Sequence, residues 1–183
     1  MASIIGVETL QHTNGTTAAT IDSSGKVSFP NTGEYDIWHQ TSNTSTGAGA
    51  GDLTTKWARY ATNWEKIGTG VSESSGIFTF PSTGKWKVCF AVNFQSTGNA
   101  SYLGGQIMSS TDSGSTFLSL VDAYGAADHS GAYEFVNMEG YLDVTDASTF
   151  RVKFRKDQDI VATLRGSSSS LRTYISFEKL AET

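Results

Sequence analysis

The chain has 183 residues and a formal net charge of −5, and 38% of its residues are apolar. This acidic balance argues against a general nucleic-acid binder, which needs a basic surface to attract phosphates. No apolar run approaches the roughly 18 residues of a membrane-spanning helix, so we expect neither nucleic acid nor a membrane among its partners.

Small hydroxylated residues are abundant, with 24 serines and 23 threonines. They favour turns and solvated strand faces over long helices.

The first 33 residues differ in texture from the rest of the chain. They are apolar at 4–10 and then polar and rich in turn residues, with Asn14-Gly15 marking a predicted hairpin turn. This stretch has too few large apolar side chains for a core of its own, so we expect it to pack on the main domain, on neighbouring copies or on a larger assembly. Residues 1–33 are therefore predicted to be an attachment arm, whose docking residues are Ile4, Ile5, Val7, Leu10, Ile21, Val27 and Phe29.

Residues 23–33 (SSGKVSFPNTG) and 74–84 (SSGIFTFPSTG) repeat one pattern 51 positions apart. Each copy holds one of the two prolines of the chain, Pro30 and Pro81. Proline lacks the N–H that a sheet requires, and the glycine three residues later supplies a turn. Each copy is predicted to form a strand, a corner and a second strand. Whether 29–38 belongs to the arm or to the following domain stays open at this point.

Residues 84–94 (GKWKVCFAVNF) show the clearest alternation in the chain and are predicted to be the central strand of the core. Burying the five large side chains of one face would contribute on the order of 10 kcal/mol before entropy is counted. Residues 149–155 (TFRVKFR) show the same alternation, with Phe150, Val152 and Phe154 predicted to face inward. The inward residues of the first segment are Trp86, Val88, Phe90, Val92 and Phe94.

Other short segments are also predicted to be strands, and no segment shows a sustained helical periodicity. The stretch 41–51, which ends in GAGAG, is either a flexible linker or a long surface loop inside the domain. Many short strands separated by Gly-, Ser-, Asn- and Asp-rich turns predict an all-β fold, an antiparallel two-sheet jelly-roll sandwich over 34–183 with an extended N-terminal arm over 1–33. The additional strands are predicted at 54–60, 63–67, 76–80, 102–108, 117–122, 132–144, 159–165 and 171–180.

No arrangement of residues indicates catalysis, and we predict a non-enzymatic protein with no catalytic residue, metal or cofactor. The histidines His12, His39 and His129 are too widely scattered for a metal-ligand spacing, and no Gly-x-Ser-x-Gly nucleophile motif is present. A single cysteine, Cys89, excludes an intrachain disulfide. The aspartates Asp157 and neighbouring Asp159 are interpreted as solvated turn residues in preference to calcium ligands.

A basic strand face is formed by Arg151, Lys153 and Arg155, together with Lys156. It is a candidate site for an anionic ligand such as a surface sugar. The alternative, which we favour, is that these charges keep an exposed strand from pairing wrongly. Three tyrosines are candidates for stacking on sugars or for the core: Tyr102, Tyr124 and Tyr133.

The stretch 57–94 resembles the signature region of the TNF-like jelly rolls, specifically the globular head of the complement recognition subcomponent. The ending 167–181 (SSSSLRTYISFEKLA) is similar to the final strand of that fold. TNF-like heads trimerise by packing aromatic and aliphatic side chains around a three-fold axis, so the resemblance implies a homotrimer with Tyr133, Phe135 and Tyr174 near the axis. The matching positions in the signature region are Asn63, Gly68, Gly70, Gly76, Phe78, Pro81, Gly84 and Trp86.

The stretch 7–27 is similar to a short leader that precedes diverse domains in structural proteins of marine tailed phages. The two resemblances together imply a bacteriophage virion structural protein, a trimeric surface decoration or fibre head on the virion surface, docked on other capsid or tail proteins by its arm. Host surface glycans are a further candidate partner. The alternatives are a tail-fibre receptor-binding head and a bacterial carbohydrate-binding or adhesin module.

Overall fold

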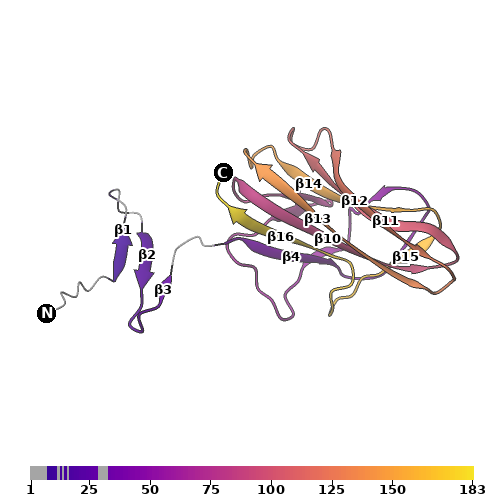
Figure 1. The fold of residues 1–183 in the computed structure, drawn as a ribbon, viewed down its shortest axis with the longest axis horizontal. Helices are drawn as coiled ribbons and strands as arrows, with labels where there is room; N and C mark the ends of the chain where they lie inside the picture. Colours follow the sequence, from indigo (N-terminus) through magenta and orange to yellow (C-terminus); the bar gives the residue numbers. More distant parts are fainter. Residues whose placement is uncertain (1–7, 12, 14, 16, 29–32) are drawn as a thin grey trace. The chain divides into compact units, whose positions relative to one another are not determined.

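The computed structural model describes residues 8–11, 13, 15, 17–28 and 33–183 (Figure 1), and every regular element in this part of the chain is a strand. The chain divides into two compact units, 1–33 and 34–183. No helix long and apolar enough to cross a bilayer occurs among the described residues.

The N-terminal unit contains three short antiparallel strands, β1 (Thr9–Gln11), β2 (Thr17–Ile21) and β3 (Val27–Ser28), in the order β1-β2-β3. The predicted docking residues Ile4, Ile5, Val7 and Phe29 lie outside the described residues. Of the other three, Leu10 and Val27 are about half exposed and Ile21 is half-buried.

The second unit, which we call the head, is a sandwich of two antiparallel sheets, as predicted (Figure 1). In the seven-stranded sheet, β10 pairs with β13 along one edge, and β16 and β15 divide its other edge. The strands of this sheet are β4 (Tyr35–Gln40), β5 (Thr44–Thr46), β7 (Trp57–Arg59), β10 (Gly84–Ser96), β13 (Tyr133–Val144), β15 (Ala162–Leu164) and β16 (Tyr174–Ala181).

The six-stranded sheet covers the other side of the core. Its order is β12-β11-β14-β9-β8, and β6 also pairs with β14. The strands of this sheet are β6 (Gly51–Asp52), β8 (Ser72–Ser74), β9 (Ile77–Thr79), β11 (Ala100–Ser110), β12 (Leu118–Ala127) and β14 (Arg151–Gln158).

The core lies where β10 and β14 face each other, and the alternation of buried residues along both strands was predicted from the sequence. The five inward residues predicted on β10 are all 0–1% exposed, and Val152 and Phe154 of β14 are fully buried. Aromatic rings join the two sheets, since the Phe78 ring lies 5.4 Å from that of Phe177, and the Phe90 ring lies 5.1 Å from that of Phe154, between centroids. The prediction for both segments is confirmed.

The prediction of a strand at 63–67 was wrong. Ile67 exchanges two backbone hydrogen bonds with Tyr35, and the positive φ angles of Gly68 and Gly70 then turn the chain away. The second strand predicted after the first repeat copy is present as Tyr35–Gln40, whereas the short strands β5, β6 and β8 were absent from the predicted set.

The stretch 41–51 lies inside the head, and the flexible-linker interpretation is wrong. It contains the short strand β5, which pairs with β15, and a loop that leads into β6, which pairs with β14. The Lys156 ammonium donates hydrogen bonds to the carbonyl oxygens of Gly47 and Gly49. Lys156 is therefore buried on the opposite side of β14 from the basic face to which it was assigned, and burial lowers its pKa.

Candidate functional site

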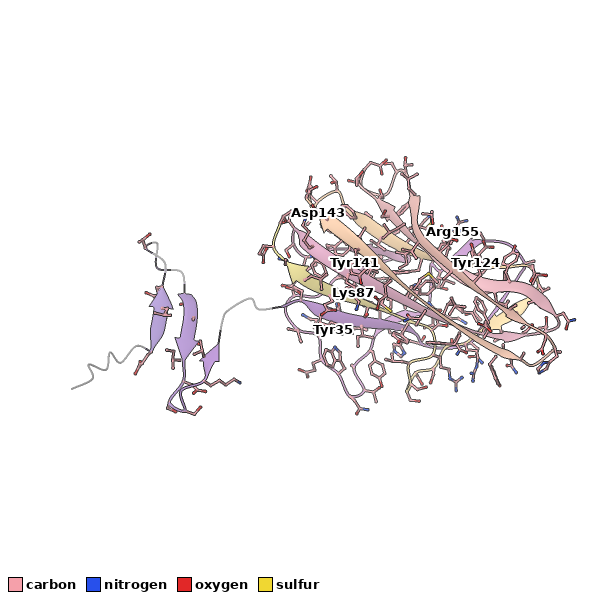
Figure 2. All side chains as sticks on the ribbon, in the orientation of Figure 1. Tyr35, Lys87, Tyr124, Tyr141, Asp143 and Arg155 are labelled. Atoms are coloured by element: carbon pink, nitrogen blue, oxygen red, sulfur yellow. The ribbon has the colours of Figure 1, made fainter. Side chains whose placement is uncertain are left out.

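The outward surface of the seven-stranded sheet is the candidate site, and we call it the aromatic face. Outward residues follow from the strand register: Lys87 of β10 stands opposite Tyr141 of β13 on one side and Glu178 of β16 on the other, and Glu178 stands opposite Tyr35 of β4. Because directly paired residues share one side of a sheet, these side chains form a row across four strands. Figure 2 labels three of them, Tyr141, Lys87 and Tyr35.

Strand β13 supplies the most exposed part of the aromatic face. Tyr133, Phe135 and Tyr141 are 59%, 51% and 63% exposed, while the alternate residues of the strand from Val136 to Val144 are buried. Exposed aromatic side chains of this kind indicate an interaction surface. The outward side of β13 therefore carries large aromatic residues toward both ends of the strand, with polar residues between Phe135 and Tyr141.

The middle of the aromatic face carries small side chains. Cys89 and Ala91 of β10 and Ser176 of β16 point to this surface by register, yet each is less than 10% exposed. Larger side chains surround them, with Tyr174 opposite Ala91 and Ile37 opposite Ser176. Burial raises the pKa of the Cys89 thiol, so this cysteine is a small packed side chain and not a reactive thiolate.

Charges on the aromatic face are paired within the chain. The Lys87 ammonium lies 3.2 Å from a Glu139 carboxylate oxygen and 3.9 Å from one of Glu178. The hydrogen bond that Lys87 donates to Glu139 raises the pKa of Lys87. Lys85 forms a second pair with Asp143. Both lysines of this face are therefore neutralised by carboxylates of the same chain.

The structure brings the three predicted axis residues to this one face. Tyr133 and Phe135 lie on β13 and Tyr174 lies on β16. The Arg165 guanidinium stacks over the Tyr133 ring, 4.3 Å from its centroid. The sequence analysis missed Tyr141, although it continues the period-two spacing of Tyr133 and Phe135.

The predicted basic face points outward from the six-stranded sheet, but each cation has a partner within the chain. Asp52 of β6 lies between Lys153 and Arg155, with nitrogen–oxygen distances of 2.8 Å and 3.0 Å. Arg151 donates to the carbonyl oxygens of Phe150 and Ser148. β14 is paired with β11 along one edge and with β9 and β6 along the other, so the interpretation that these charges keep an exposed strand from pairing wrongly is also wrong.

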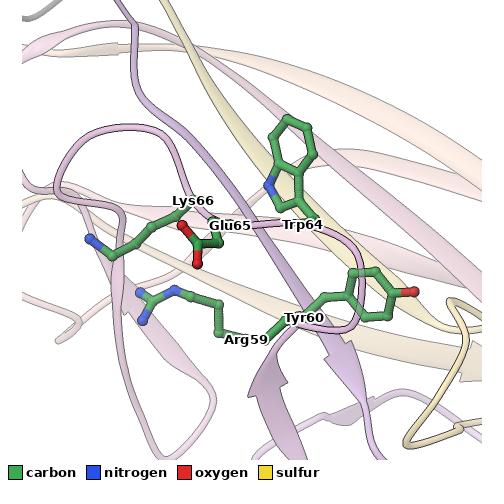
Figure 3. A pocket seen from close by; sticks show the side chains of 6 residues that line it. Arg59, Tyr60, Trp64, Glu65 and Lys66 are labelled. Carbon is green, nitrogen blue, oxygen red and sulfur yellow. The ribbon is translucent and has the colours of Figure 1, made fainter.

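A cavity of about 370 Å³ is lined by the segment that follows β7 (Figure 3). Its two cations are engaged elsewhere: Arg59 binds the Asp36 carboxylate, and the Lys66 ammonium donates to the carbonyl oxygens of Gly68 and Thr69. Its lining residues are Arg59, Tyr60, Ala61, Trp64, Glu65 and Lys66.

The loop aspartates have protein partners. Asp159 accepts a hydrogen bond from the Ser101 amide, and Asp157 accepts one from the Tyr124 hydroxyl. Within the described ranges, no group of three or more His, Cys, Asp or Glu side chains is placed to hold a metal ion. His129 contacts only its neighbour Asp128 in an exposed pair.

No protein-family model and no curated protein matches the sequence. Solved structures do match the fold. Murine APRIL at pH 8.0 aligns with a TM-score of 0.58 at 14% identity over 81% of this chain and 99% of its own. Eiger TNF from S. frugiperda aligns with a TM-score of 0.60 at 10% identity, over 81% of this chain and 93% of its own. The head therefore has a TNF-like jelly-roll fold.

Proposed function

We propose that the protein is a non-enzymatic bacteriophage virion structural protein, a homotrimeric surface decoration or fibre head docked by its N-terminal arm. The observation that carries the proposal is the aromatic face, which leaves large apolar side chains in water on a TNF-like head. The phage-leader resemblance of 7–27 supports the virion location. The charged side chains of the head pair with one another, which agrees with a position on the virion surface.

The apolar area exposed on β13 indicates how much of the head the trimer interface must include. Aromatic side chains bury about 150–250 Å² each, so Tyr133, Phe135 and Tyr141 leave about 350 Å² exposed per protomer, worth about 9 kcal/mol on burial. Association costs about 4–15 kcal/mol in lost freedom. The gain from β13 falls within this range of costs and leaves no clear surplus, so we expect the interface to extend across β16 and β4 to Tyr174, Ile37 and Tyr35.

Sedimentation equilibrium of the full chain at micromolar concentration tests the assembly. We expect a trimer, and a Phe135→Asp variant is expected to dissociate, because the carboxylate would be buried without a partner. Leu118→Asp is the matched control, since Leu118 is 70% exposed on the other sheet. A monomeric wild-type protein, or dissociation by both variants, would contradict the proposal.

The arm is proposed to dock by strand addition. β1 and β3 are the outer strands of a three-stranded sheet, and only Ala19 is buried among the described apolar residues of this unit. Ordering each residue costs about 1–2 kcal/mol of backbone entropy, so such a unit gains stability from an external partner. An added strand supplies backbone hydrogen bonds together with side-chain pockets.

Deletion of residues 1–30 tests docking separately from folding. We expect the truncated head to keep its melting temperature and its trimeric state, and to be lost from purified virions. Immunogold labelling of particles that carry the full chain then distinguishes a capsid position from a tail position. Normal incorporation of the truncated head would refute the docking role, and its unfolding would show that the arm belongs to the sandwich of the head.

A further inference from the structure

An aromatic corner stands on the outward surface of the six-stranded sheet, away from the aromatic face. Tyr124 of β12 pairs with Gly104 of β11, and Gly104 pairs with Asp157 of β14. The Tyr124 hydroxyl donates to an Asp157 carboxylate oxygen at 3.2 Å. Because the residue between them has no side chain, the tyrosine reaches across a whole strand. Figure 2 labels Tyr124 beside Arg155 on this side of the head.

Glycine is required at position 104 for this arrangement. A Cβ atom placed there would lie 2.6 Å from the Cδ1 atom of the Tyr124 ring and 2.1 Å from the carbonyl oxygen of Ala123. Both separations are far shorter than van der Waals contact, so any larger residue would displace the tyrosine. The Gln106 side-chain amide also donates to the Tyr124 hydroxyl, at 3.3 Å. The ring is therefore held in place before any ligand arrives, which lowers the entropy cost of binding.

The Tyr102 ring meets the Tyr124 ring at 87°, with 5.6 Å between centroids. Tyr102, Tyr124 and Asp157 line an open surface hollow of about 350 Å³. Beside it, the Arg155 guanidinium donates to the Gln106 side-chain oxygen. Apolar ring surface and fixed polar groups thus converge on one hollow.

The polar groups decide the chemistry of the ligand. Burial raises the pKa of Tyr124, and the charges of Asp157 and Asp122 act in the same direction, so the phenol stays a neutral donor and acceptor. An anionic ligand would place its charge next to Asp157, which is unfavourable. A ligand that offers C–H groups to an aromatic surface and hydroxyl groups to a carboxylate and an amide fits all three features.

We propose that the corner formed by Tyr102, Tyr124 and Asp157 is a binding subsite for a neutral pyranose sugar. One face of the sugar ring packs on an aromatic ring, and its hydroxyl groups donate to Asp157 and exchange hydrogen bonds with Gln106. The subsite lies on the six-stranded sheet, so it stays open when the aromatic face is covered. It also stands apart from the proposed virion role, because it needs only the head.

Saturation-transfer NMR and calorimetry on the full chain test the subsite. The probes are the methyl pyranosides of glucose, galactose, mannose and N-acetylglucosamine, titrated to about 50 mM because a single small site binds weakly. We expect at least one of them to bind. Tyr124→Ala is expected to weaken it about tenfold or more, and Asp157→Asn is expected to weaken it while keeping the fold.

Leu118→Ala is the control, because Leu118 is a 70% exposed apolar residue at the start of the same strand, β12, and takes no part in the corner, so the variant should leave sugar binding unchanged. Thermal melting of each variant separates loss of the site from loss of the fold, and Asp157→Asn carries the test if Tyr124→Ala does not fold. The proposal is overturned if no probe binds the wild-type chain, or if binding survives unchanged in folded Tyr124→Ala or in Asp157→Asn. Binding of free N-acetylneuraminic acid alone would also overturn it.

Discussion

Replacing Asp36 by alanine should destabilise the head more than any other single removal of a carboxylate. Asp36 is 1% exposed and accepts four hydrogen bonds, two from the Arg59 guanidinium at 2.9 Å and 3.0 Å, one from the Trp38 indole and one from the Val71 amide. These donors come from β4, from β7 and from the segment that leads into β8. The carboxylate therefore joins three parts of the chain.

The expected magnitude follows from the donors left behind. The Arg59 side chain is about one third exposed and can turn to water, so its loss of a partner adds little. The Trp38 indole N–H and the Val71 amide would be left without an acceptor, and each unsatisfied donor costs about 1–3 kcal/mol of folding stability. The sum is about 4 kcal/mol. For a chain of this length about 1 kcal/mol shifts the melting temperature by 2–4 °C, so the melting temperature should fall by about 8–16 °C.

Thermal unfolding followed by circular dichroism measures this difference, with all proteins at one concentration because assembly also shifts the melting temperature. Asp143→Ala is the matched control. Its carboxylate pairs with Lys85, and both side chains are nearly half exposed. Surface pairs contribute at most about 1 kcal/mol, so the control should melt within about 4 °C of the wild-type protein. If Asp36→Ala melts as close to the wild type as the control does, the reasoning from stranded donors fails.

Three further predictions concern the core and its ionisation. Burial lowers the pKa of His39 below its usual value of about 6.5. The folded state therefore binds a proton at His39 less readily than the unfolded state does. The contribution of neutral His39 to stability is complete above about pH 6.5 and falls as the pH drops toward the folded pKa. Urea midpoints should therefore decline from pH 7 to pH 5, and a decline of equal size in His39→Gln would contradict this. Phe90→Ala should cost about 3–5 kcal/mol in urea unfolding, because Phe90 is fully buried beside Phe154; a cost below about 1 kcal/mol would show that the site collapses. Gly70→Ala should cost about 1–3 kcal/mol, because φ is +73° there and a Cβ would lie 2.6 Å from the Asp36 carboxylate, whereas Gly98→Ala, which meets no atom within 4 Å, should be neutral in the same melt.

Regular alternation made β10 and β14 predictable, because one side of each strand is buried in apolar surroundings and the other is not. β4 lacks that alternation, since Asp36, His39 and Gln40 are all buried, and only the Phe-Pro-x-Thr-Gly corner before it predicted a strand there. Each has partners that the sequence does not reveal: the side-chain amide of Gln40, for example, donates to the carbonyl oxygen of Thr55 at 3.0 Å. A buried polar residue looks like a solvent-facing one until its partner in another strand is known.

The candidate sites were likewise predictable only where they follow the alternation of a strand. Period-two spacing predicted Tyr133 and Phe135 on one side of β13, and the same rule would have included Tyr141 and excluded Lys156 from the basic face. The sequence offered Tyr102 and Tyr124 as candidates for stacking on sugars, but it did not predict that they meet at one corner beside Asp157. That arrangement depends on the register of β12 against β11 and β14, which places Gly104 between Tyr124 and Asp157.

The repeated Ser-Ser-Gly triplet shows where local sequence stops deciding structure. In the second copy, Ser75 and Gly76 have φ angles of +52° and +80° and close a two-residue turn between β8 and β9. In the first copy, only Gly25 has a positive φ, and the turn between β2 and β3 is longer, since Ile21 pairs with Val27. The repeat therefore does not encode one structural unit, although in both copies the glycine supplies the left-handed residue.

The residue before each triplet accounts for the difference. Asp22 has a short side chain, and its carboxylate accepts hydrogen bonds from the amides of Ser24 and Lys26, which holds the chain in a wider loop. Glu73 is one methylene longer and accepts instead from the Gly76 amide at 2.6 Å. Packing then fixes the second turn, because a Cβ at Gly76 would lie 2.3 Å from the Leu53 carbonyl oxygen, whereas Gly25 has no atom within 4 Å. The same three residues thus form a loop set by a neighbouring aspartate in one unit and a turn set by tertiary contact in the other.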